Sequence, residues 1–238
     1  MSFVVPAVLP SSHEDLETKL AHLASVPSLS RVQIDVVDGK FATPACWPYT
    51  APKELRDMVA QGEMLPYLDR IAYEIDLMCL DVQSAANAWV ALGASRLTFH
   101  AESIIDLAQF LAHAREHYGC GVISCDLISI GLAINIESDL ALIEPHLDQV
   151  DYVQFMGIAR IGRQGQPFDQ RVLEKLRLFR ERHPEMVVQV DGGVSLESAP
   201  ELLALGVSNL IVGSAILHAA DPHAELEKFE ALASGHTV

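Results

Sequence analysis

Short apolar runs rich in β-branched residues alternate with longer segments in which apolar positions recur every three to four residues. The first pattern predicts strands and the second predicts amphipathic helices. The expected strands are Phe3–Leu9, Val32–Val37, Ile71–Met78, Arg96–His100, Gly121–Leu127, Tyr152–Met156, Val187–Val190 and Asn209–Val212. The expected helices are His13–Val26, Lys53–Ala60, Val82–Leu92, Ile105–Tyr118, Ser138–Leu147, Gln170–Arg182, Leu196–Leu205 and His223–Ala233. We interpret the brief apolar segment Gly131–Asn135 as a return of the chain between the fifth strand and its helix.

The alternation of strand and helix predicts parallel strands, because consecutive parallel strands need a crossover connection that is usually a helix. Eight such units close into a (β/α)8 TIM barrel of typically about 250 residues, and this chain has 238. No linker or low-complexity tract interrupts the pattern, so we expect one domain over residues 1–238. The alternative, a doubly wound open sheet, needs a glycine-rich turn after the first strand, where this chain has Pro10-Ser11-Ser12.

The charge balance limits the classes of partner that the protein can bind. Thirty-two acidic and 16 basic residues give a formal charge of −16, which disfavours nucleic acid and anionic membranes because both require a basic surface. A small phosphorylated ligand held by backbone N–H groups is still compatible with this charge. The apolar N-terminal segment has no basic residues and contains Pro6 and Pro10, so we interpret it as a strand and not a signal peptide. The four cysteines have no CxxC spacing and favour a reducing compartment, so we expect a cytoplasmic protein.

Acidic residues stand where two expected strands end. Asp35 closes one apolar run, Asp38-Gly39 opens the loop that follows, and Asp191 comes directly after another run. The chemistry of TIM barrels lies at the carboxyl ends of the strands, and two carboxylates there can remove a proton from one face of a carbon and return it to the other. The plainer interpretation is a turn or a helix cap. Asp76 adds a third acid on the lumen side, and three converging carboxylates would suit a hard divalent cation.

Glycines follow the last two expected strands. Gly192-Gly193 and Gly213-Ser214 stand in the two loops in which TIM barrels often bind phosphate, and glycine lets the backbone approach phosphate oxygens closely. Arg160 or Arg163, in the loop after the sixth strand, could reach the same phosphate, although solvated arginines explain them equally well. His100, at the end of the fourth strand, is a further site candidate, with a structural hydrogen bond as its plainer role.

With their neighbouring segments, these residues make the chain resemble the ribulose-phosphate 3-epimerase family over nearly its whole length. The segments that carry the resemblance are Val5–Leu9, Ile34–Phe41, Asp76–Met78, Thr98–Glu102, Gly131–Asn135, Gly165–Phe168, Val190–Val194 and Gly213–Ile216. The resemblance implies a TIM barrel of the ribulose-phosphate-binding type that interconverts ribulose 5-phosphate and xylulose 5-phosphate. It also implies a homo-oligomer.

The resemblance implies roles for individual residues. Asp35 and Asp191 would transfer protons at carbon 3 and, together with Asp76, would be candidate ligands of a divalent metal. Phosphate binding would fall to Gly165, Gly192, Gly193, Gly213 and Ser214. Beside these, Met78 at the end of the third expected strand, His100 at the end of the fourth and Arg163 in the loop after the sixth are our candidates for substrate contacts.

The chain departs from the family pattern at the site and not in the barrel. The family binds its metal partly through two histidines, and this chain has Gln33 at the first position and Asp76 at the second. Ala7 replaces a substrate-contacting serine, and the loop Arg160–Gly165 lacks the family's Pro-Gly-Phe-Gly-Gly. Because the remaining donors are all oxygen, they favour Mg²⁺ or Mn²⁺ over Zn²⁺ or Fe²⁺, or no metal at all.

We therefore expect an epimerase of a ketopentose phosphate. One alternative is another phosphosugar isomerase, aldolase or decarboxylase on the same barrel, and the other is a non-catalytic sugar-phosphate binding protein. The related decarboxylases carry a D-x-K-x-x-D motif, whereas Asp35-Val36-Val37-Asp38 contains no lysine. That difference weighs against the decarboxylase branch.

Overall fold

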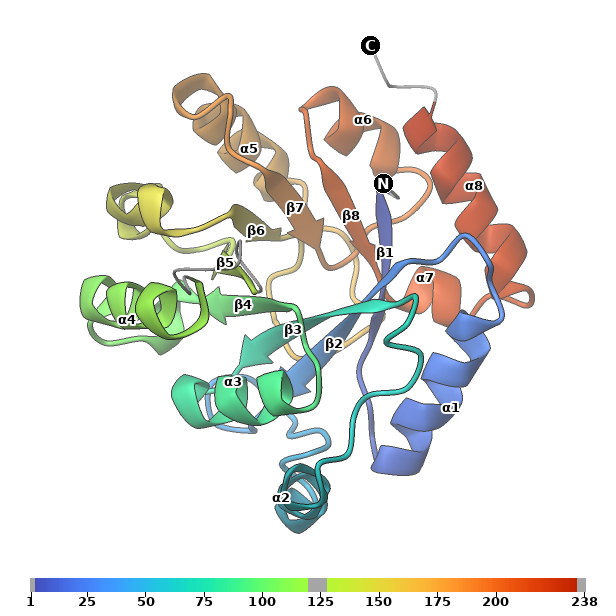
Figure 1. The fold of residues 1–238 in the computed structure, drawn as a ribbon. Coiled ribbons are helices and arrows are strands. Elements are labelled where there is room, and N and C mark those ends of the chain that lie inside the picture. Colours follow the sequence, from blue (N-terminus) through green and yellow to red (C-terminus); the bar gives the residue numbers. More distant parts are fainter. Residues whose placement is uncertain (1–2, 120–127, 235–238) are drawn as a thin grey trace.

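Eight parallel strands close into a barrel that is surrounded by helices (Figure 1). The structure, a computed structural model, describes residues 3–119 and 128–234. Its strands are β1 (Val4–Val8), β2 (Arg31–Val37), β3 (Ala72–Met78), β4 (Arg96–His100), β5 (Ser129–Ile134), β6 (Tyr152–Met156), β7 (Val188–Asp191) and β8 (Asn209–Val212). Each strand pairs in parallel with the next, and β8 pairs with β1, so the (β/α)8 TIM barrel is confirmed.

Helices cover the outside of the barrel. The α-helices among the described residues are α1 (His13–Ala24), α2 (Pro52–Gln61), α3 (Val82–Ala91), α4 (Leu107–Ala114), α5 (Arg171–Arg182), α6 (Ala199–Ala204), α7 (Ser214–Leu217) and α8 (Pro222–Ser234). Ser12 caps the N-terminus of α1, because its hydroxyl accepts a hydrogen bond of 3.1 Å from the backbone N–H of Asp15. No helix of the described chain is long and apolar enough to cross a membrane.

The fifth strand differs from the expectation. The segment Gly121–Leu127, expected as this strand, lies outside the described residues. The strand that pairs with β4 and β6 is Ser129–Ile134, so the interpretation of Gly131–Asn135 as a return of the chain is wrong. Two short apolar runs follow one another here, and periodicity alone cannot decide between them.

Three expected helices are shorter or wound differently. Over Ser138–Leu147 the chain forms 3₁₀ turns at Leu140–Leu142 and Glu144–Gln149 in place of an α-helix. Pro145 lies in this segment and has no N–H for an α-helical hydrogen bond. Helix α4 passes into a π-helical turn at Arg115–Gly119. The helix expected from Leu196 to Leu205 is α-helical only over α6.

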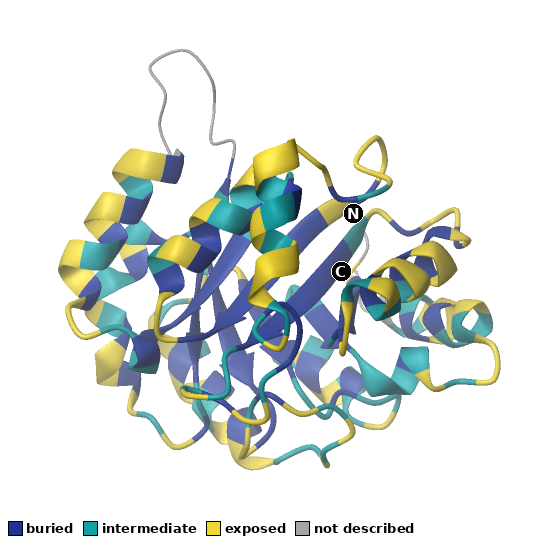
Figure 2. Ribbon diagram, turned by 90° about the horizontal axis from the view of Figure 1, so that it is seen from below, coloured by how far each residue is buried: buried dark blue, intermediate teal, exposed yellow. Residues whose placement is uncertain are grey.

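Most strand positions are buried on both faces, as parallel sheets require, and exposed residues lie along the outer sides of the helices (Figure 2). The outward strand side chains and the helices form one large apolar core. The lumen is polar. Glu74 on β3 accepts hydrogen bonds from Arg96 and Thr98, each at 3.0 Å, and from Gln189. Burial opposes ionisation of Glu74, but Arg96 and Arg31 outweigh it and lower its pKa.

We predict that Gly131→Ala destabilises the barrel, because a Cβ at this position of β5 would lie 2.1 Å from the ring of the buried Tyr152 on β6. Overpacking of this kind costs about 3 kcal/mol in the free energy of unfolding, measured by urea denaturation. Gly62→Ala is the matched control. A Cβ there meets no atom within 4 Å, so only the strain of its positive φ remains, about 1 kcal/mol. Equal losses in the two variants would contradict the placement of β5.

Candidate active site

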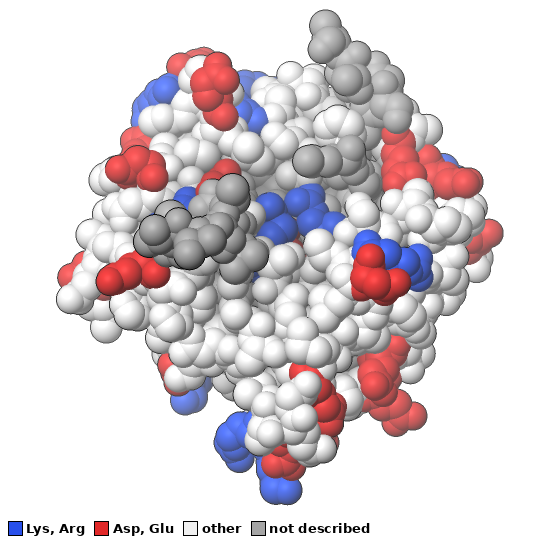
Figure 3. Space-filling model, in the orientation of Figure 1, with Lys and Arg blue, Asp and Glu red and all other residues white. Residues whose placement is uncertain are grey.

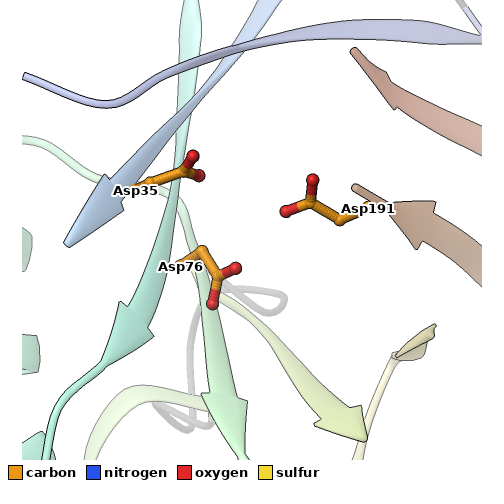
Figure 4. Close-up of side chains that lie close together, drawn as sticks. All are labelled: Asp35, Asp76 and Asp191. Carbon is orange, nitrogen blue, oxygen red and sulfur yellow. The ribbon is translucent and has the colours of Figure 1, made fainter. Parts of the chain in front are cut away.

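Three buried carboxylates meet at the carboxyl ends of the strands. Asp35 on β2, Asp76 on β3 and Asp191 on β7 point toward one another (Figure 4). One oxygen from each lies within 4.8 Å of the others. Asp35 and Asp76 are register partners on adjacent strands, whereas Asp191 lies far along the sequence and reaches the cluster only because the sheet closes. The structure therefore brings together the three acids expected to share a site.

Two glutamine amides hold the carboxylates in place. The Gln33 amide nitrogen donates to Asp35 Oδ1 at 2.8 Å and to Asp191 Oδ2 at 2.7 Å. The Gln154 amide nitrogen donates to Asp76 Oδ2 at 2.9 Å and, more weakly, to Asp191 Oδ2 at 3.4 Å. Both glutamines are fully buried. Each amide thus bridges two carboxylates and favours their charged forms by hydrogen bonding.

His100 lies behind Asp76. Its Nε2 is 3.0 Å from Asp76 Oδ1, and both side chains are completely buried. Burial lowers the pKa of an imidazole, but the Asp76 carboxylate outweighs this effect and raises the pKa of His100. The contact with Asp76 therefore favours the protonated form of His100, whose positive charge would lie beside the three acids. Neither residue lines the pocket described below, so this geometry places His100 as a support for Asp76.

The pKa values of Asp35 and Asp191 are raised above the usual range of an aspartate. Burial raises the pKa of Asp191 to about 8, with a further contribution from the negative charge of Asp76. Burial and the charges of Asp191 and Asp76 also raise the pKa of Asp35 well above its usual range. Such shifts arise when like charges share a site that excludes water. Because of these shifts, the Asp35–Asp191 pair can take up and release a proton near neutral pH.

A small pocket of about 50 Å³ opens directly above Asp35 and Asp191. It contains nine of the eleven residues expected in the site, all except Asp76 and His100. These nine are Asp35, Met78, Arg163, Gly165, Asp191, Gly192, Gly193, Gly213 and Ser214. Catalytic, phosphate-binding and substrate-contact candidates from five different strand ends thus share one cavity.

The glycines of this pocket are required by close approaches of the backbone. A Cβ on Gly193, whose φ is +67°, would lie 2.5 Å from the backbone of Phe168, and one on Gly192 would lie 2.7 Å from Ile158. These contacts fix the loop after β7 against the loop after β6. The backbone N–H groups of such a loop can line an anion site without any side chain in the way.

Gln164 closes the pocket on one side. Its amide nitrogen donates to the carbonyl oxygen of Ala7 at 3.0 Å and would lie 2.7 Å from a Cβ on Gly213. Gln164 and Gln154 were not among the site residues expected from the sequence. Gln154 carried a usable signal, because it is a polar residue at a lumen-facing position of an otherwise apolar strand. Gln164 carried none, since loop glutamines are common.

The chain matches the model of the ribulose-phosphate 3 epimerase family over residues 3–217. Its relatives include three proteins named ribulose-phosphate 3-epimerase. The one from Schizosaccharomyces pombe is 23% identical over 219 residues, with 92% of this chain and 88% of the relative covered. The one from Escherichia coli K12 is 27% identical over 226 residues, covering 92% and 90%. The one from Aquifex aeolicus is 27% identical over 202 residues, covering 83% and 82%.

Solved structures support the fold. The chain is similar to 3-hexulose-6-phosphate synthase from Salmonella typhimurium, with a TM-score of 0.69, 16% identity and complete coverage of both chains. It is also similar to KGPDC from Streptococcus mutans, with a TM-score of 0.69, 15% identity and complete coverage of both chains. At such low identities, the similarity to these two solved structures concerns the fold alone. The family match, in contrast, spans both the barrel and the residues of the pocket. The chain is therefore an isomerase-type enzyme that belongs to the ribulose-phosphate 3 epimerase family.

Proposed function

We propose that the protein epimerises a ketopentose phosphate at carbon 3, in the manner of the ribulose 5-phosphate and xylulose 5-phosphate pair. The observation that carries this proposal is the position of Asp35 and Asp191. Their carboxyl groups face each other across the floor of one pocket, with a wall of glycine backbone beside them. A sugar phosphate anchored at that wall would present one carbon to both acids.

The proposed reaction moves two protons and breaks no carbon–carbon bond. The ionised member of the pair takes the proton from carbon 3, and the electron pair of that C–H bond passes to the neighbouring carbonyl, which gives an enediolate. The protonated member then delivers a proton to the opposite face of carbon 3. This scheme needs one carboxylate and one carboxylic acid at the same time, a state that their raised pKa values favour near neutral pH.

The phosphate group would anchor the substrate in the pocket for this reaction. In our proposal the backbone of Gly193, Gly213 and Ser214 binds its oxygens, and Arg163, whose Nε now donates to the Thr43 carbonyl at 3.0 Å, adds a local positive charge. A chain with a charge of −16 cannot attract an anion through its overall field, so these short-range donors must do so. Binding energy from the phosphate would then orient carbon 3 between the acids.

The donor set fits a hard divalent cation. Asp35, Asp76 and Asp191 would hold it, and the buried carbonyl oxygen of Gln33, which has no hydrogen-bond partner among the described residues, is a fourth oxygen nearby. When bound, Mg²⁺ or Mn²⁺ would stabilise negative charge on the substrate oxygens next to carbon 3. Without an imidazole among these donors, the set offers little selectivity for Zn²⁺ or Fe²⁺.

Substituting either acid with its amide should abolish epimerisation. We expect Asp35→Asn and Asp191→Asn each to lower kcat/KM for ribulose 5-phosphate by roughly a thousandfold, because each removes one of the two proton carriers. The assay follows xylulose 5-phosphate formation and deuterium entry from solvent at carbon 3, with Mg²⁺, Mn²⁺, Zn²⁺ or Co²⁺ in turn. Asp57→Asn on the outer side of α2 is the control and should retain full activity. Native protein that exchanges no deuterium with any of these metals would refute the proposed reaction.

The raised pKa of Asp191 also predicts a pH-dependent stability. The folded state holds this proton up to a pKa of about 8, whereas the unfolded chain releases it near ~3.9. The contribution of this proton to the stability of the fold is complete below the pKa that Asp191 has in the unfolded chain. It is lost as the pH rises to the pKa that Asp191 has in the folded state. In metal-free buffer at pH 8.5, Asp191→Asn should therefore be more stable than the native protein by about 1–2 kcal/mol in urea unfolding. The difference should shrink at pH 5.5, and a gap that does not change with pH would contradict the assignment.

Binding of Mn²⁺ tests the cation directly and without turnover. Calorimetry on chelator-treated protein should detect one Mn²⁺ per chain, and Asp76→Asn should weaken its binding by at least about tenfold, because one carboxylate ligand is lost. Asp57→Asn should bind Mn²⁺ as the native protein does. If native protein takes up no Mn²⁺ or Mg²⁺, the cation part of the proposal fails while the two-acid part stands on its own assay.

A further inference from the structure

Arginines gather at the opposite mouth of the barrel, where the strands begin. Figure 3 looks onto this end and shows basic side chains in a hollow near its centre. Two arginines begin strands there, Arg31 in β2 and Arg96 in β4. Burial lowers the pKa of Arg31, the negative charge of Glu74 opposes this shift, and the positive charge of Arg96 adds to it. The two guanidinium groups and the Glu74 carboxylate therefore lie near one another.

The carboxylates at this mouth do not balance the arginines. Glu74 accepts the Nε–H of Arg96 at 3.0 Å, and its remaining hydrogen bonds come from Thr98 and Gln189. The Nη2 of Arg31 donates to the side-chain amide of Asn209, a neutral partner, and no described carboxylate lies within ion-pair distance of Arg31.

Arg115 and Asp151 form a second ion pair near this mouth, and their charges cancel. Arg115 binds Asp151 with two hydrogen bonds, of 2.8 and 3.1 Å. Together, Arg31, Arg96 and Arg115 with Glu74 and Asp151 carry one net positive charge among these five described side chains.

The unused donors are held in place and reached by water. The guanidinium of Arg96 lies over the ring of Tyr152, with its carbon 4.1 Å from the ring centroid, which fixes its plane. No described residue accepts a hydrogen bond from Arg96 Nη1 or Nη2, or from Arg31 Nε or Nη1, and none of these atoms is among the buried atoms without a partner. Two pre-positioned guanidinium edges facing solvent suit the oxygens of a tetrahedral oxyanion.

We propose that this mouth binds a small tetrahedral oxyanion of the size of inorganic phosphate, with Arg31 and Arg96 as its ligands. The site lies at the end of the barrel opposite the glycine-lined pocket, so one chain would have two anion sites. Glu74 keeps its hydrogen bonds from Thr98 and Gln189 when the anion binds, so no buried carboxylate has to lose its partners.

Calorimetric titration with inorganic phosphate at low ionic strength tests this site. Ser214→Asp serves as the background, because a carboxylate in the glycine-lined pocket repels phosphate from that end. We expect this variant to bind one phosphate per chain. Adding Arg31→Gln should weaken the binding by at least about tenfold. Arg56→Gln on exposed α2 removes the same charge elsewhere and should leave the affinity unchanged.

Arg31→Lys covers the case in which Arg31→Gln does not fold. It keeps the charge but loses the planar fork, and we expect phosphate to bind it several-fold more weakly. Phosphate should also raise the thermal midpoint of the background variant and of Arg56→Gln more than that of either Arg31 variant. Equal phosphate affinity in all variants, or no binding to the Ser214→Asp background, would overturn the proposal. None of these readouts depends on turnover, so the result is independent of the epimerase assay.

Discussion

The structure depends on one constraint, the burial of three carboxylates around a single point at the top of the barrel. Like charges at this separation raise one another's pKa and would repel without compensation. The amides of Gln33 and Gln154 and the imidazole of His100 supply that compensation from neighbouring strands. The closed barrel fixes these strands relative to one another, so its register sets the spacing on which any proton transfer relies.

The pattern of apolar runs was enough to predict the barrel, because strand and helix alternate too regularly for another fold. It failed at β5, where two adjacent apolar runs competed and only the pairing of Gly131 beside Tyr152 decides between them. The acids and glycines of the pocket were predictable because each follows a strand. The contacts of Gln154 and Gln164 were not, since they depend on which side chains meet across the lumen and between loops, and a single sequence holds no such distances.

Two of the positions at which the chain departs from the family pattern, Gln33 and Asp76, lie in the carboxylate cluster. By the resemblance to the family, Gln33 and Asp76 stand at two histidine positions, and Asp76 puts one more carboxylate into the cluster. His100, which pairs with Asp76, and Gln154, which reaches both Asp76 and Asp191, offset the negative charge of the cluster.

The side chain of Gln164 has a consequence for how tightly the pocket can hold a ligand. Its amide already rests against Gly213 and is hydrogen-bonded to Ala7, in a space with room for only a few water molecules. If the pocket binds phosphate as proposed, the anion would have to compete with this tethered amide, whose local concentration is set by the loop and not by the solution. The affinity would then be a difference between two occupied states, and shortening this one side chain would change it.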